Sequence, residues 1–342
     1  MAVRHMPQPQ AGPTPERFFQ AINAYQITAA LRTAIELELF TAIQEGASTP
    51  AELAARVHAD ARRIRMLCDF LTVEGHLTKH DGRYGLPEDT ATFLVKTSPA
   101  YLGGTIQFLL CQDHMRAFEN LTTIVKHGVP AEGMHNTVAP ENPMWVDFAR
   151  SMSPMMRMPA EGIAQYLVAG KAQPWKVLDI AAGHGLFGIA MARHNPQAKI
   201  VAVDWGGVLK VAQENAAHAG VAERYSTLPG SAFEVDFGSG YDVALVTNFL
   251  HHFDHKTVVG LLRKIHTSLK PGGRVAVLEF VPEEDRISPP LPAKFAIIML
   301  AGTPGGDAYP YSQYQKMFQE AGFASSELVR LPGPESLVVA HK

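Results

Sequence analysis

Residues 177–188 read VLDIAAGHGLFG, and this stretch decides the fold of the C-terminal half. An apolar run enters a turn with glycines at positions 183 and 185, and residues typical of a helix follow. Glycine suits such a turn because the backbone must bend tightly and approach a ligand closely. The spacing Gly183-x-Gly185-x-x-Gly188 also matches the dinucleotide fingerprint, which is a weak motif when it stands alone. The stretch therefore predicts a strand, a ligand-binding turn and a helix.

Short apolar runs alternate with helical stretches on the C-terminal side of residue 174. The runs are Lys176–Ile180, Lys199–Asp204, Tyr225–Pro229, Val243–Thr247 and Arg274–Phe280. Helical stretches such as Phe187–His194 and Lys256–Leu269 lie between them, as in a parallel α/β sheet. Two further runs, Ser325–Leu331 and Ser336–His341, flank a Pro-Gly-Pro turn, so the last strand should be antiparallel. We expect a doubly wound, mostly parallel, seven-stranded Rossmann-like sheet over residues 171–342.

Two carboxylates help to choose the ligand of this domain. Asp179 lies near the end of the first strand, four residues before the first glycine, where a pyrophosphate would be repelled. An ammonium group would be attracted there, and S-adenosylmethionine carries both an amino acid moiety and a sulfonium. Asp204 ends the second strand and is placed to accept ribose hydroxyls from either ligand class. We favour the methyl donor; a nicotinamide cofactor, and a purely loop-capping Asp179, remain alternatives.

The front half of the chain reads as short helices followed by a hairpin. Apolar residues recur at helical spacing from Glu16 to about Glu45. The capping box Thr49-Pro50-Ala51-Glu52 starts a helix over Ala51–Val57, and Asp60 can cap the next helix, Ala61–Glu74. A hairpin at 77–86 follows, around Asp81-Gly82. This order predicts an α-helical, winged-helix-like domain over residues 16–100. Residues 1–15, rich in Pro and Gln, should be a flexible tail, and residues 101–170 a helical connector.

Composition limits the possible partners and compartments. The chain has 342 residues, enough for two domains, and a net charge of -3. Although Arg62, Arg63 and Arg65 lie on a would-be recognition helix, no wider basic patch supports DNA binding, so we expect no nucleic-acid partner and keep a DNA-binding regulator as a distant alternative. Only two cysteines occur, and neither a signal peptide nor a bilayer-spanning apolar run is evident. A cytoplasmic protein without a membrane partner is expected.

Several motifs recur in the order known from one enzyme family. They are Asp179–Gly185, Asp204, Gly230–Phe233, Leu250–Phe253 and Lys270–Gly273. From about Phe18 to its end, the chain resembles class I S-adenosylmethionine-dependent small-molecule O-methyltransferases, including plant caffeic-acid-type and bacterial polyketide enzymes of secondary metabolism. The resemblance implies S-adenosyl-L-methionine as donor, S-adenosyl-L-homocysteine as product, a small aromatic acceptor and a homodimer formed through the N-terminal domain. No metal is expected, since His251, His252 and His255 lack accompanying ligands.

The resemblance also assigns residues. The general base would be His251, oriented by Glu279. The donor site would comprise Asp179, Gly183, Gly185, Asp204, Trp205, Ser231, Ala232, Phe233 and Asn248. The acceptor pocket, lined in part by residues 101–170, would include Cys111, Phe148, Met152, His252 and Met299.

The proposed base also has a physical rationale. A phenol has a pKa of about 10 and is mostly protonated at neutral pH, so an imidazole can take its proton as the methyl group arrives. His251 follows one predicted strand and Glu279 ends the next, which brings both to the same sheet edge. Some positions depart from the family pattern. His252 and Ala308 replace acids, Ser231 replaces the usual Asp, and Cys111 stands where plant members often carry Asn. C- or N-methylation and cofactor-assisted cyclisation, decarboxylation or hydroxylation therefore remain alternatives.

Overall fold

The computed structural model describes residues 12–129, 141–168 and 173–342 and divides into two compact units. The first unit is Met1–Gly103 and the second is Gly104–Lys342. Most of the predicted tail, residues 1–11, lies outside the described residues. Among the described helices, none combines the length and the apolar content that crossing a lipid bilayer requires.

The first unit is helical and ends in a small hairpin. Its elements are α1 (Glu16–Glu36), α2 (Leu39–Gln44), α3 (Pro50–Arg56), α4 (Ala61–Val73), β1 (Thr78–His80), β2 (Arg83–Gly85) and α5 (Glu88–Leu94). The capping box forms as expected, because the Thr49 hydroxyl accepts the Glu52 amide and the Glu52 carboxylate accepts the Thr49 amide. The apolar helical repeat from residue 16 to 45 forms two helices, α1 and α2, since Glu38 adopts a left-handed φ of 55° between them.

The second unit is built on a seven-stranded sheet with the spatial order β5-β4-β3-β6-β7-β9-β8. Its strands are β3 (Lys176–Ile180), β4 (Lys199–Asp204), β5 (Tyr225–Pro229), β6 (Tyr241–Thr247), β7 (Leu269–Glu279), β8 (Ser325–Arg330) and β9 (Ser336–His341). The first five are parallel, and β9 runs antiparallel to both β7 and β8. The predicted mostly parallel sheet and its antiparallel last strand are confirmed.

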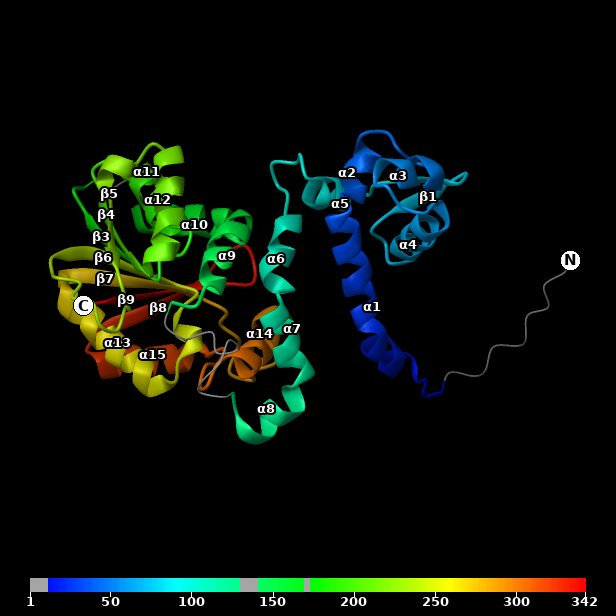
Figure 1. The fold of residues 1–342 in the computed structure, drawn as a ribbon. Helices are drawn as coiled ribbons and strands as arrows, with labels where there is room; N and C mark the ends of the chain where they lie inside the picture. Colours follow the sequence, from blue (N-terminus) through cyan, green and yellow to red (C-terminus); the bar gives the residue numbers. More distant parts are fainter. Residues whose placement is uncertain (1–11, 130–140, 169–172) are drawn as a thin grey trace, which may run out of the picture. The chain divides into compact units, whose positions relative to one another are not determined.

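Helices cover both faces of this sheet (Figure 1). One face packs against α10 (Ser153–Val168), α11 (Leu186–His194) and α12 (Gly206–His218), and the other against α13 (His255–Ser268) and α15 (Tyr311–Ala321). The central strands β3, β6 and β9 carry near-continuous buried residues, as strands covered on both faces require, whereas the edge strands β5 and β8 are mostly half-buried or exposed.

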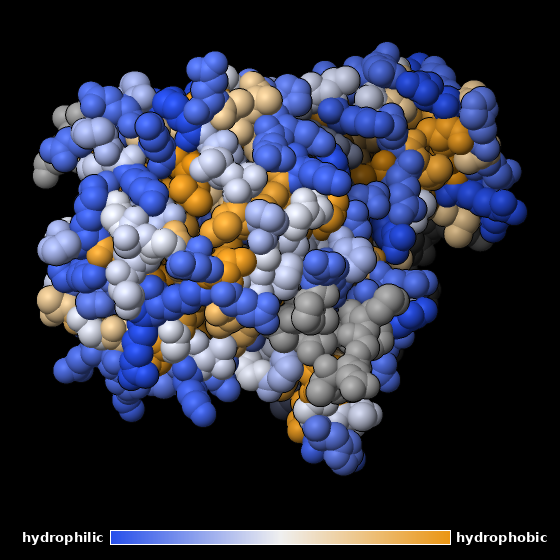
Figure 2. Space-filling model, turned by 60° about the vertical axis from the view of Figure 1, so that its left-hand side comes forward, coloured by the Kyte–Doolittle hydropathy of each residue, from blue (hydrophilic) through white to orange (hydrophobic). Residues whose placement is uncertain are grey.

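Further helices of the second unit belong to neither of these two layers. They are α6 (Ile106–Leu109), α7 (Gln112–Glu119), α8 (Leu121–His127), α9 (Met144–Ser151) and α14 (Pro290–Gly302). Residues 104–168 of the predicted connector thus belong to the same compact unit as the sheet. The face drawn in Figure 2 is mostly hydrophilic, with groups of apolar residues between the polar ones.

Candidate active site

A cavity of about 900 Å³ lies in the second unit, where the five parallel strands end. The residues that follow β3, β4, β5, β6 and β7 each contribute to its wall, which is where doubly wound sheets bind ligands. Side chains of α6, α7, α9 and α14 complete the wall. This volume is at the upper end of the roughly 300–1,000 Å³ typical of small-molecule sites.

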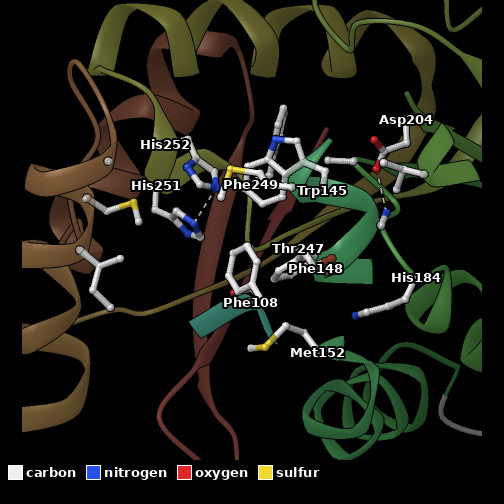
Figure 3. Close-up of a pocket in the computed structure, with 18 of the residues that line it drawn as sticks. Phe108, Trp145, Phe148, Met152, His184, Asp204, Thr247, Phe249, His251 and His252 are labelled. Carbon is white, nitrogen blue, oxygen red and sulfur yellow. Dashed lines mark hydrogen bonds between the residues drawn. The ribbon is translucent and has the colours of Figure 1, made fainter. Parts of the chain in front are cut away.

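The glycine turn forms one end of the cavity. Gly183 and Gly185 have φ values of 57° and 76°, in the left-handed region that favours glycine. The Gly183 amide donates to Oδ2 of Asp204 at 2.8 Å, and the Trp205 amide donates to Oδ1 at 2.7 Å; Figure 3 shows Asp204 on the wall of the pocket. Burial raises the pKa of Asp204 to about 6. One carboxylate on the cavity wall therefore fixes the turn after β3 to the end of β4.

Asp179 lies beneath the turn and does not line the cavity. It is fully buried, and its Oδ2 accepts the Gly188 amide at 3.0 Å, at the start of α11. Oδ1 has no hydrogen-bond partner among the described residues. Burial raises the pKa of Asp179 from 3.8 to about 8. Direct contact between this carboxyl and a ligand stays a prediction, because the residue supports the turn from below.

The raised pKa of Asp179 should make stability depend on pH. Between about pH 4 and pH 8 the folded chain holds a proton on Asp179 that the unfolded chain has released, so the free energy of unfolding should fall as pH rises through this window. Asp179→Asn should flatten this slope while its amide oxygen still accepts the Gly188 amide. Urea unfolding of both proteins at pH 5 and pH 8 tests this, and equal slopes would contradict it.

The candidate base and its partner are already joined. Nδ1 of His251 lies 2.5 Å from Oε2 of Glu279, and both side chains are buried. Oε1 of Glu279 accepts the backbone amides of Phe249, Leu250 and His251, at 3.1, 2.8 and 3.3 Å. The carboxylate at the end of β7 thereby fixes both the imidazole and the turn that carries it. A neutral His251 that donates through Nδ1 presents Nε2 as an acceptor.

His252 lies beside this nitrogen. Its Nε2 is 3.1 Å from Nε2 of His251, and its ring packs edge-on against Trp145 with centroids 5.3 Å apart (Figure 3). Burial, together with the charge of His251, lowers the pKa of His252 well below its ordinary value. A neutral His252 can therefore donate to His251 from the cavity side.

Most of the residues predicted for the site lie on the cavity wall. Those from the predicted donor site are Gly183, Asp204, Trp205, Ser231, Ala232, Phe233 and Asn248. Those from the predicted acceptor pocket are Phe148, Met152, His252 and Met299, and His251 joins them. Gly185 and Glu279 lie directly behind the wall. Cys111 is not among the lining residues: it immediately precedes α7, whose Asp113, His114 and Ala117 line the cavity, and its contact with an acceptor stays a prediction.

A cluster of aromatic side chains on this wall surrounds Phe148 and was not predicted from the sequence. Phe108 packs edge-on against Phe148 with centroids 5.0 Å apart, Trp145 packs against Phe148 at 5.5 Å, and His184 stacks on Phe148 at 6.3 Å. The spacing of Trp145 and Phe148, three residues apart on one helix, was a signal that could have found Trp145. Burial lowers the pKa of His184 to about 4, so it is neutral there.

A second missed residue is Glu335, in the turn before β9. It lines the cavity with 5% of its surface exposed, and burial raises its pKa to about 7. By contrast, Asp307, the acid nearest the position where the family pattern expected one, pairs with Nη1 of Arg286 at 2.7 Å. No sequence signal marked Glu335, because it stands in a loop outside every motif.

The charges on the wall suit a cationic ligand. Five carboxylates line the cavity, from Asp113, Glu141, Asp204, Glu234 and Glu335. Lys294 is the one lysine or arginine among the lining residues that the structure describes. Across residues 12–129, 141–168 and 173–342, no group of three His, Cys, Asp or Glu side chains is arranged to hold a metal ion.

Both units match known domain families. Residues 126–324 match the O-methyltransferase domain, and residues 19–96 match the O-methyltransferase dimerisation domain. The S-adenosyl-L-methionine-dependent methyl transferase PigF of Serratia is 26% identical over 91% of each chain. The 3-hydroxy-5-methyl-1-naphthoate 3-O-methyltransferase of Streptomyces sahachiroi is 26% identical over 92% of each chain.

Solved structures agree with this fold. The crystal structure of a candidate O-methyltransferase from Nostoc punctiforme superposes with a TM-score of 0.93 and is 49% identical, covering 97% of this chain and all of that one. The structure of PigF with S-adenosylhomocysteine superposes with a TM-score of 0.84 at 24% identity, covering 96% of this chain and all of that one, and shows likeness of fold alone.

Proposed function

This chain belongs to the O-methyltransferase family, and from that premise we propose that it methylates a phenolic hydroxyl of a small aromatic or polyketide-like molecule, with His251 as general base. It is a S-adenosylmethionine-dependent O-methyltransferase of the natural-product type. The observation that supports the finer proposal is the pair of His251 and Glu279, which lies at the cavity where the parallel strands end.

The residues at the glycine turn fit the donor. Asp204 and Trp205 would hold the nucleoside, and Ala232 and Phe233 would lie beside the adenine. The carboxylates of the wall would favour the positive charge of the sulfonium. Asn248 adds a buried amide oxygen without a partner among the described residues, available to an ammonium group. When bound, S-adenosylmethionine supplies an activated methyl group on a sulfonium.

The chain's own residues would hold the acceptor and move its proton. The aromatic group around Phe148 and the side chains of α14 would hold a flat ring and exclude water from it. The acceptor hydroxyl would replace His252 as the donor to Nε2 of His251, which would then take the proton. The Glu279 carboxylate would stabilise the positive charge that His251 gains.

The N-terminal unit supports a homodimer. Its match to the dimerisation domain points to pairing of two chains, and α1 carries large apolar side chains that are exposed in the single chain. Those side chains are Phe18, Phe19, Ile22 and Tyr25, each more than half exposed. A pairing of two copies would cover an apolar surface that a single chain leaves in water.

A second candidate reaction has support of its own. The relatives include the L-tyrosine C(3)-methyltransferase of Streptomyces lavendulae and the aclacinomycin 10-hydroxylase RdmB of Streptomyces purpurascens, 26% and 28% identical. In addition, His252 contacts the nitrogen that a hydroxyl would need. Carbon methylation or cofactor-assisted hydroxylation is therefore the alternative to transfer onto oxygen.

Mass spectrometry of products separates these reactions. The protein is incubated with S-adenosylmethionine and a panel of phenols and hydroxylated polyketides. We expect a gain of one methyl group that fragmentation places on oxygen. A methyl group on carbon, or a gain of one oxygen atom, would support the second candidate. Calorimetric titration with S-adenosylhomocysteine and with NAD checks the donor, and binding of NAD alone would contradict the whole proposal.

A further inference from the structure

Glu335 is a buried acid on the cavity wall for which the proposed mechanism has no use. Its side chain is 5% exposed, and its Oε1 has no hydrogen-bond partner among the described residues. A buried carboxylate oxygen without a donor is costly, so such groups usually meet a partner when a ligand binds. Because Glu335 lines the cavity, that partner can be a bound molecule.

The position of Glu335 is tied to that of the base. Ser336, the first residue of β9, pairs with Glu279, the last residue of β7. Glu335 immediately precedes Ser336 in the chain, so it lies just beyond this pair, at the end of the sheet that faces the cavity. The Glu279 carboxylate in turn contacts His251. Two acids thus serve different purposes: Glu279 at the end of β7 holds the base, and Glu335 in the turn before β9 presents an oxygen without a partner among the described residues to the same cavity.

The surroundings of Glu335 define what it would bind. Burial is the main cause of its raised pKa, so little water reaches this carboxyl. Lys294 is the only lysine or arginine on the described wall, against five carboxylates, so a second anion would be repelled. A group that donates a hydrogen bond, a hydroxyl or an amine, would satisfy the Glu335 oxygen.

We infer that Glu335 is a specificity-determining residue that accepts a hydrogen bond from a second donor group of the acceptor. The acceptor is then an aromatic compound that carries, besides the methylated hydroxyl, another hydroxyl or an amino group, and no carboxylate near it. This inference rests on the proposed function, because it assumes an aromatic acceptor in this cavity. It adds the class of acceptor that this wall selects.

Binding to the protein saturated with S-adenosylhomocysteine tests the inference. The probes are 1-naphthol and 2-naphthol, the dihydroxynaphthalenes, the aminonaphthols and the hydroxynaphthoates, measured by calorimetry. At least one dihydroxy or amino compound should bind about 10-fold tighter than the naphthol that shares its first hydroxyl, as expected when a buried oxygen without a partner gains a hydrogen bond. The hydroxynaphthoates should bind weakest. Comparing the diols with the aminonaphthols shows which donor is preferred.

Variants assign the preference to one side chain. Glu335→Leu has similar size and no acceptor, so it should abolish the preference, while Glu335→Gln keeps a neutral acceptor and should retain part of it. Glu327→Leu is the matched control, because Glu327 is an exposed acid on β8 of the same hairpin. Equal wild-type affinities, no binding of any probe, or a preference that survives Glu335→Leu would overturn the inference.

The two proposals fail separately. If methylated phenols form but the second donor group brings no gain in affinity, the inference about Glu335 is wrong and the proposed reaction stands. If the preference depends on Glu335 but no phenol in the panel is methylated, the reaction is wrong and the binding assignment stands.

Discussion

His251→Ala should lower kcat by about 10²–10⁴-fold, the usual effect of losing a general base. The Glu279 carboxylate holds the His251 imidazole at 2.5 Å, so a neighbouring group would have to rearrange to take its place. Affinity for S-adenosylhomocysteine should stay essentially unchanged, because the described side-chain partners of His251 are Glu279, His252 and Phe295, none of which belongs to the glycine turn. Single-turnover kinetics and calorimetric titration measure the two quantities.

Two further histidine variants make this result interpretable. His255→Ala is the matched control, since His255 is a partly exposed neighbour that pairs with Glu320, and its turnover should equal that of the wild type. His252→Ala should keep most of the activity if this residue only donates to the base. A larger loss in His252→Ala than in His251→Ala would show that the roles are reversed.

The second large effect concerns the glycine turn. Gly185→Ala should lower the free energy of unfolding by about 2–5 kcal/mol, the sum of about 1–2 for a Cβ at positive φ and about 1–3 for overpacking. The added Cβ would lie 2.6 Å from the Tyr225 hydroxyl and 2.9 Å from Cβ of Ala212, both inside the protein. The turn would have to shift, and affinity for S-adenosylhomocysteine should fall with it.

Gly220→Ala separates the two contributions. Gly220 has a similar φ of +70°, but no heavy atom lies within 4 Å of its added Cβ. It should therefore lose only the backbone contribution, about 1–2 kcal/mol, and keep its affinity for S-adenosylhomocysteine. Urea unfolding of both variants measures the difference, and equal losses would show that crowding at Gly185 is absorbed by its neighbours.

Much of the fold could be predicted from local pattern. The first three sheet strands begin and end where the predicted runs do; for β3 the reason is that a buried parallel strand is apolar on both faces, whereas β5 is a half-buried edge strand. Strand β7 was misjudged, since it begins at Leu269 and includes the Lys-Pro-Gly-Gly segment that separates helix from strand in the sequence. Glu38 was missed as a break because glutamate at positive φ depends on tertiary packing and leaves no local signal.

The site divides along similar lines. Asp204, His251 and Glu279 were predictable because the carboxyl ends of parallel strands meet at one edge. Phe108, His184 and Glu335 were not, because they come from loops and from short helices whose approach to the cavity depends on the whole fold. Cys111 was placed by family pattern alone, and it stands immediately before α7, whose Asp113, His114 and Ala117 line the cavity.

The backbone of residues 249–251 binds a carboxylate as an anion-binding loop would, and that carboxylate is the side chain of Glu279 in the same chain. Three consecutive main-chain N–H groups converge on one oxygen of Glu279, and the other oxygen orients the imidazole. Folding has therefore already oriented the three backbone amides, the Glu279 carboxylate and the imidazole, so these groups need little reorganisation when the imidazole gains a proton. Substitutions on α7 and α9, which line the cavity but supply none of these groups, should therefore leave the imidazole aligned.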